Sequence, residues 1–133
     1  MQSRDSNSPQ ESRPWSRMAC ALLFIITGIW HFVQPRPFIA IVPAMLPFPA
    51  AIVYVTGAWE ILGGIGLLTR RYRKWAAIAL VALLVAVFPA NINMAVNHIT
   101  LGLPEPVLWL RLPLQFVLIF WVLAASRDTG GSQ

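Results

Sequence analysis

Long apolar runs, separated by short polar or proline-rich segments, dominate this chain. Four of these runs, at about residues 18–33, 50–68, 75–96 and 106–125, contain few charged side chains. A helix needs about 20 apolar residues to cross the hydrocarbon core of a bilayer, and each run comes close to that length. We therefore predict an all-α integral membrane protein, a four-helix bundle whose membrane domain spans residues 17–125.

The segments outside these runs predict tails and connections. Residues 1–16 and 126–133 are polar and lack hydrophobic periodicity, which predicts a disordered tail at each end. Residues 34–49 contain five prolines, so we expect no regular helix there, although the apolar side chains indicate packing on the bundle. Pro89 falls inside the third run and is expected to kink that helix. The first run is predicted to be a retained helix rather than a signal peptide, because bulky Trp30 and Phe32 follow instead of a small-residue cleavage site.

Composition supports the membrane interpretation. Of the 133 residues, 57% are hydrophobic and 11% are charged, which excludes an ordinary soluble domain and leaves no room for a separate catalytic one. The net charge of +5 alone would be compatible with a nucleic-acid partner. The cations lie at the ends of the predicted helices, however, so we expect a lipid bilayer as partner and no nucleic acid.

The placement of the cations predicts an orientation. Of the ten Lys and Arg residues, eight fall in the two tails, at the start of the first helix or in the loop from Arg70 to Lys74. Only Arg36 and Arg111 belong to the other side. Because cytoplasmic segments carry an excess of positive charge, we predict that both termini are cytoplasmic in a multi-pass protein of the bacterial plasma (inner) membrane.

Glu60 lies near the middle of the second run, IVYVTGAWEILGGIGLL. An acid at this depth is costly and indicates a functional site. Gly57, Gly63 and Gly64 share its helical face, and small residues suit close helix contact. Two interpretations stay open: Glu60 handles a proton or contacts a ligand, or it closes an internal hydrogen-bond network.

Polar residues of the other helices are predicted to reach similar depths. At ~1.5 Å per residue, Asn91 and Arg111 lie roughly 8 Å below the outer boundary and Gln115 one turn deeper; His31 ends the first helix. We predict a polar pocket open to the exterior, lined by Glu60, Arg111, Gln115, Asn91 and His31. Arg111 is either a counter-ion, for Glu60 or for an anionic ligand, or an anchor that snorkels outward. Gln115 either bridges Arg111 to Glu60 or packs between helices.

The remaining candidate residues predict no haem or metal site. Asn91 and Asn93 point about 200° apart on a helix, and one of them is expected to cap the kink at Pro89. His31 and His98 raise the option of a haem or metal site, but His98 falls near a loop and no carboxylate or thiol cluster joins them. No metal site is therefore predicted. Cys20 is the single cysteine and is assigned to packing.

Two parts of the chain resemble a known family. They are IVPAMLPFP followed by VTGAWEILGGIGLL, within residues 41–68, and VFPANINMA with LWLRLPLQ, within residues 87–115. These segments resemble the DoxX-like (DoxX/DoxD) family of small four-helix membrane proteins. The resemblance implies an inner-membrane bundle, and some relatives are linked to sulfur oxidation that delivers electrons to quinone with a separate partner subunit.

Three classes of function follow. The first, implied by the resemblance, is an accessory subunit of a membrane redox system, with a quinone as possible cofactor in the pocket and a membrane or peripheral redox partner subunit. The second is a non-catalytic binder of a small molecule. The third is an assembly or chaperone subunit that docks another membrane protein through the face of Gly57, Gly63 and Gly64. No complete catalytic constellation is present, so enzymatic activity stays open, and a homo-oligomer is compatible with the pattern.

Overall fold

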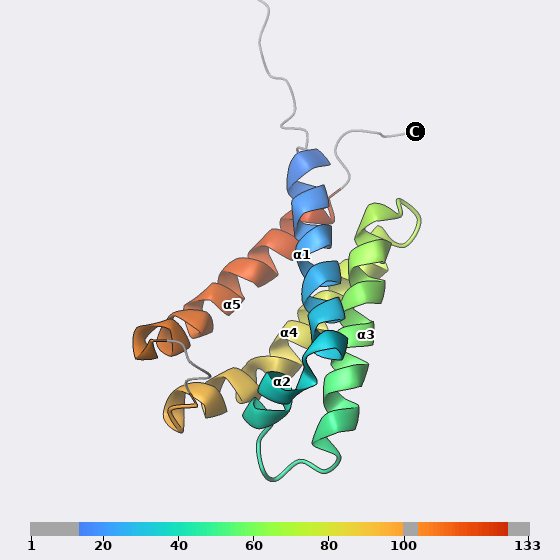
Figure 1. Cartoon of the computed structure of the whole chain (residues 1–133). Helices are drawn as coiled ribbons and strands as arrows, with labels where there is room; N and C mark the ends of the chain where they lie inside the picture. Colours follow the sequence, from blue (N-terminus) through green and yellow to red (C-terminus); the bar gives the residue numbers. More distant parts are fainter. Residues whose placement is uncertain (1–13, 100–103, 128–133) are drawn as a thin grey trace, which may run out of the picture.

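The computed structural model describes residues 14–99 and 104–127, and this part of the chain is helical (Figure 1). The helices are α1 (Pro14–Val33), α2 (Pro35–Ile41), α3 (Pro49–Leu68), α4 (Arg73–Val96) and α5 (Glu105–Ala125). All except the short α2 are long and apolar enough to cross a membrane. The prediction of an all-α chain with four such helices is confirmed.

The α2 helix corrects the prediction for the proline-rich segment. Pro35 and Pro37 stand in its first turn, where a backbone N–H has no helical partner, so proline costs little there. The helix ends at Ile41, and Val42 is extended with ψ 127°, as expected of a residue that precedes a proline. Five prolines therefore limit the helix to residues 35–41 rather than forbidding it.

The other helix boundaries lie close to the predicted ones. The α3 and α5 helices also have proline in the first turn, at Pro49 and Pro106. The α1 helix begins at Pro14, so residues 14–16 are helical where a disordered tail was predicted. Again a proline stands at the first helical position, where it favours a helix start. The rest of the predicted N-terminal tail, and residues 128–133 of the C-terminal one, lie outside the described residues.

The long helices pack in the order α1, α3, α4, α5. Glycines permit the close approach of α1 and α3: a Cβ added to Gly57 would lie 2.8 Å from the Cβ of His31, and one added to Gly64 would lie 2.7 Å from the carbonyl oxygen of Ala21. Gly63 faces Leu80 of α4. The three glycines predicted to form a contact face thus lie against helices of the same chain, which leaves this face closed to an outside partner.

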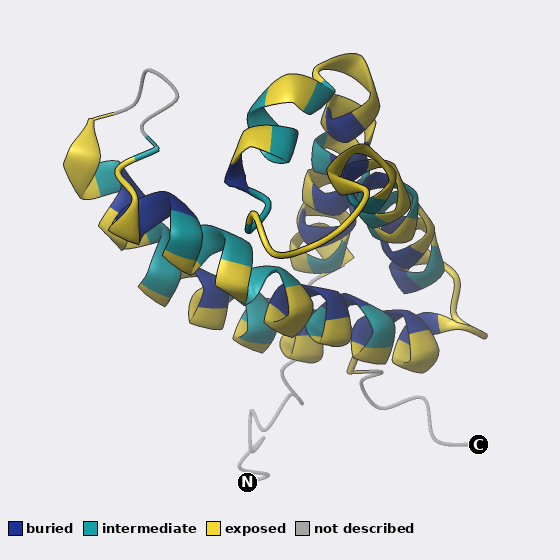
Figure 2. Ribbon diagram, turned by 90° about the horizontal axis from the view of Figure 1, so that it is seen from below, coloured by how far each residue is buried: buried dark blue, intermediate teal, exposed yellow. Residues whose placement is uncertain are grey.

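Two apolar clusters hold the bundle together at its two ends. The larger joins α1, α3, α4 and α5 and includes Cys20, Phe24, Leu67 and Leu80. The smaller joins α2, α4 and α5 through Ile41, Met94, Ala95 and Leu108. Figure 2 shows that the buried residues face inward while the exposed ones form the outer faces of the helices. Many of these outward side chains are large and apolar, as in a protein whose surroundings are hydrocarbon.

Candidate functional site

Between the two clusters lies a cavity of about 500 Å³, lined by side chains from all five helices. Most of its lining is apolar. Its polar lining residues divide between two walls, formed by α1 and α3 and by α4 and α5: Thr27, His31, Thr56, Glu60, Asn91, Arg111 and Gln115. The structure thus brings together in one cavity the five residues that sequence reasoning selected from four helices.

The wall formed by α1 and α3 is organised around His31. Its Nδ1 lies 2.7 Å from the carbonyl oxygen of Thr27 and 3.3 Å from Oε2 of Glu60. Since a carbonyl only accepts, the hydrogen on Nδ1 points toward Thr27. The imidazole ring of His31 stacks on the ring of Phe38 of α2, with centroids 3.8 Å apart and an interplanar angle of 16°. The hydrogen bond to Thr27 and the stacking on Phe38 therefore hold the imidazole in place.

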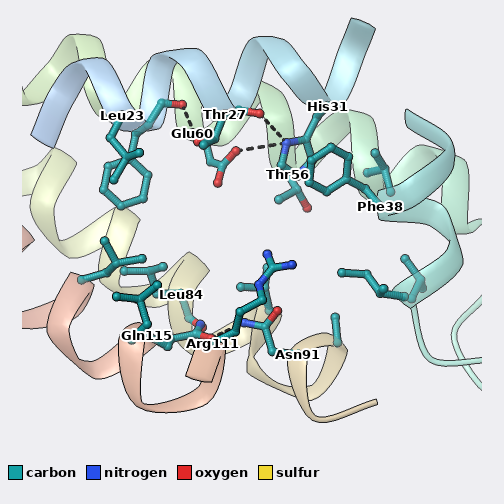
Figure 3. A pocket seen from close by; sticks show the side chains of 18 of the residues that line it. Leu23, Thr27, His31, Phe38, Thr56, Glu60, Leu84, Asn91, Arg111 and Gln115 are labelled. Carbon is teal, nitrogen blue, oxygen red and sulfur yellow. Dashed lines mark hydrogen bonds and ion pairs between the residues drawn. The ribbon is translucent and has the colours of Figure 1, made fainter. Parts of the chain in front are cut away.

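One carboxylate oxygen of Glu60 is left without a hydrogen bond. This oxygen, Oε2, is buried and has no hydrogen-bond partner. Among the described residues, no other buried side-chain oxygen or nitrogen lacks one. Figure 3 shows the carboxyl group directed into the cavity, beside His31. A buried acceptor that lacks a partner costs free energy. Such a group is suited to meet a donor supplied by a molecule in the cavity.

The wall formed by α4 and α5 is tied together by amide groups. Buried Gln115 accepts a hydrogen bond from Nδ2 of Asn91 and donates one to the carbonyl oxygen of Leu84. Asn93 donates instead to the carbonyl oxygen of Ile41 in α2, at 3.0 Å. Neither asparagine caps the kink predicted at Pro89, which corrects that expectation: each side chain reaches a neighbouring helix, Asn91 that of Gln115 and Asn93 that of Ile41.

Arg111 reaches into the cavity from α5. Among the described residues its Nη1 donates to Sδ of Met94 at 3.4 Å, and a thioether is a weak acceptor. No ion pair joins Arg111 to Glu60 in this part of the chain. Figure 3 shows the guanidinium projecting from one wall toward the space in front of Glu60 on the other. The bridge through Gln115 that the sequence left open is absent, since Gln115 is occupied by Asn91 and Leu84.

The cavity residues that were not selected from the sequence include Thr27, Thr56 and Phe38. The two threonines could have been found from helical spacing, because Thr27 precedes His31 by four positions and Thr56 precedes Glu60 by four, which places each pair on one face. Phe38 carried no comparable pattern. Its position depends on the α2 helix that the prolines obscured.

The second histidine, His98, lies outside the cavity. Nδ1 of His98 lies 2.6 Å from Oε1 of Glu105, and both side chains are exposed. This pair joins the end of α4 to the start of α5. His31 and His98 therefore do not share a site within the described residues.

Comparison with known proteins places the chain in a family but adds no activity. No curated protein and no solved structure matches it. The DoxX-like assignment is wrong, because the family that matches, over residues 20–126, is another one, described as a domain of unknown function. The redox role that the resemblance implied loses its basis with it. Since the match covers most of the sequence, the chain belongs to this family, DUF8561.

Proposed function

We propose that this chain is an integral membrane protein that binds one small amphipathic molecule in its central cavity, without a catalytic step of its own. The observation that carries the proposal is the pair Glu60 and Arg111, which face the same cavity from opposite walls without pairing with each other. Ionisable groups inside a membrane are costly. A molecule that offers a donor to Glu60 and an acceptor to Arg111 would satisfy both.

The size and lining of the cavity support binding. A volume of about 500 Å³ falls within the range of about 300–1,000 Å³ found for small-molecule sites. Its apolar lining with a few convergent polar groups has the character of such sites. A quinone fits this description as well as other amphipathic molecules do, and the experiment below distinguishes them.

The proposal includes a membrane orientation. The start of α1, the α3–α4 connection and the end of α5 lie at one end of the bundle (Figure 1). There Arg17 donates to the carbonyl oxygen of Ala125 at 2.7 Å, and Arg73 donates to that of Leu67 at 2.8 Å. Arg70, Arg71 and Lys74 belong to the same end. Because positive charge stays on the cytoplasmic side, we place both termini in the cytoplasm of a bacterial cell, with the protein in its plasma membrane.

The test is to identify what copurifies with the protein from its native membrane. The protein is extracted into nanodiscs, and bound molecules are identified by mass spectrometry, for the wild type, for Arg111→Gln and for Arg36→Gln. Arg36 is an exposed cation of α2 outside the cavity, so it is the matched control. The proposal expects one stoichiometric small molecule in the wild type and the control, and its loss in Arg111→Gln.

Two outcomes would contradict the proposal. The first is bulk lipid alone in all three preparations, which would make the polar cavity a structural feature. The second is a copurified protein whose binding is unaffected by Arg111→Gln, which would favour a role in assembly. A copurified redox enzyme together with a quinone would return support to the redox class.

A further inference from the structure

The helices α1 and α5 touch at one end and separate toward the other. Near the chain termini, Nε1 of Trp121 donates to Oγ of Ser16 at 2.8 Å, and Arg17 reaches Ala125. Away from this contact α5 diverges from α1, as Figure 1 shows. The bundle is therefore closed at the terminal end and wedge-shaped beyond it.

Three cavity residues mark a mouth in this wedge. Leu23 of α1 and Leu114 and Val117 of α5 line the cavity, and they are also 37%, 46% and 58% exposed, respectively. A side chain that lines a cavity and is also open to the outside lies where the two spaces join. All three residues are aliphatic, and all lie near the midpoints of their helices. In a bilayer this mouth opens sideways into the hydrocarbon core.

The cavity contains one cationic side chain among its described lining residues, that of Arg111. The guanidinium of Arg111 has five N–H donors in a fork that matches the two oxygens of a carboxylate or phosphate. In the described residues the hydrogen bond it makes is to the weak acceptor Sδ of Met94. A charge-assisted, bidentate pair with an oxyanion is among the strongest hydrogen-bonded contacts, so an anionic head is the partner that would satisfy this fork best.

From the mouth and the cation together we infer that the molecule bound in the cavity is an amphiphile with an anionic oxygen head and an apolar chain, and that it enters laterally from the bilayer between α1 and α5. The head accepts hydrogen bonds from Arg111, a hydroxyl of the head, where it has one, donates to Glu60, and the chain passes Leu23 and Val117 into the hydrocarbon. The inference rests on the binding function proposed above and names its ligand class.

The first arm of the test measures the head group. Delipidated protein in detergent is titrated with myristic acid, myristyl phosphate and myristyl alcohol, and bound adducts are counted by native mass spectrometry. These probes share one chain length and differ in the head. We expect at least one anionic probe to bind more tightly than the alcohol, and Arg111→Gln to weaken that probe by about tenfold or more. Arg36→Gln should leave its affinity unchanged, and the stronger anionic probe tells carboxylate from phosphate.

The second arm measures the route. Val117→Trp fills the mouth with a larger side chain, and Val55→Trp, at an exposed position of α3 outside the cavity lining, is the control. With protein in vesicles, we expect Val117→Trp to lose uptake of the membrane-dissolved probe over the period in which the wild type saturates. The Val55→Trp control should take it up normally.

The possible outcomes test the ligand class and the lateral route separately from the binding function. If the alcohol or decylubiquinone binds with the affinity of the anionic probes, the anionic class is wrong, while the binding function stands. If Val117→Trp takes up the probe at the wild-type rate, the lateral route is wrong. If none of these probes binds the delipidated protein and no anionic amphiphile copurifies from the native membrane, the ligand class is wrong. If no other small molecule copurifies either, the binding function is wrong as well.

Discussion

Gly57→Ala tests the contact on which the cavity depends, because Gly57 is where α3 meets α1 beside His31. In an isolated helix this change is favourable, since alanine exceeds glycine in helix propensity by about 1 kcal/mol. In this protein the added Cβ would lie 2.8 Å from the Cβ of His31, 2.9 Å from the carbonyl oxygen of Gly28 and 3.0 Å from Cε2 of Phe32. The local preference and the packing therefore predict opposite signs.

The packing is expected to win. Phe32 can rotate away, but neither a Cβ nor a backbone carbonyl can, so α1 and α3 must separate. Overpacking of this kind costs about 1–3 kcal/mol, and contact with backbone atoms favours the upper end. Subtracting the gain in propensity leaves a destabilisation of about 2 kcal/mol. At roughly 4 °C per kcal/mol for a chain of this size, Tm should fall by about 8 °C.

The single cysteine supplies the assay. Cys20 is fully buried in the larger apolar cluster, so a thiol-reactive dye that fluoresces on reaction reports unfolding as the detergent-solubilised protein is heated. Ala51→Leu adds a larger side chain at an exposed position of α3 and should leave Tm nearly unchanged. A rise in Tm for Gly57→Ala would show that α1 and α3 are not in the contact described, and the placement of His31 beside Glu60 would fall with it.

Two further changes test other parts of the structure. Gln115→Leu removes the hydrogen bonds to Asn91 and Leu84. At about 0.6 kcal/mol for each bond within a membrane bundle, Tm should fall by about 5 °C in the Cys20 assay; an unchanged Tm would mean that this link between α4 and α5 is not formed. The orientation is tested by labelling single introduced cysteines with a membrane-impermeant maleimide. Met45→Cys should be labelled in intact cells and Arg71→Cys only after the cells are opened, because the cationic end is expected inside. The reverse result would invert the proposed topology.

The four long helices followed from the sequence because their cause is local. An apolar segment of about 20 residues has no water in the bilayer to satisfy its backbone, so it must form its own hydrogen bonds as a helix. Depth within a helix is equally local, since each residue adds a fixed rise. Counting from helix ends was enough to select Glu60, Arg111, Gln115, Asn91 and His31, which the structure brings to one cavity.

The errors also have local causes. The prediction for residues 34–49 treats every proline as a helix breaker, whereas Pro35 and Pro37 begin a helix because they fall in its first turn. The start of α1 at Pro14 was missed for the same reason. The family resemblance rested on short segments of apolar and small residues, which unrelated membrane helices share, and the family match over residues 20–126 contradicts it.

By itself the sequence determined that the chain forms long apolar helices and which polar residues lie at common depths. The partners of those residues were decided by tertiary structure alone, because a hydrogen bond depends on the rotation and separation of two helices, which no periodicity specifies. Gln115 bonds to Asn91 and Leu84 instead of joining Arg111 to Glu60. The divergence of α5 from α1 keeps the side chains of Arg111 and Glu60 apart, and that separation is what leaves a cavity between them.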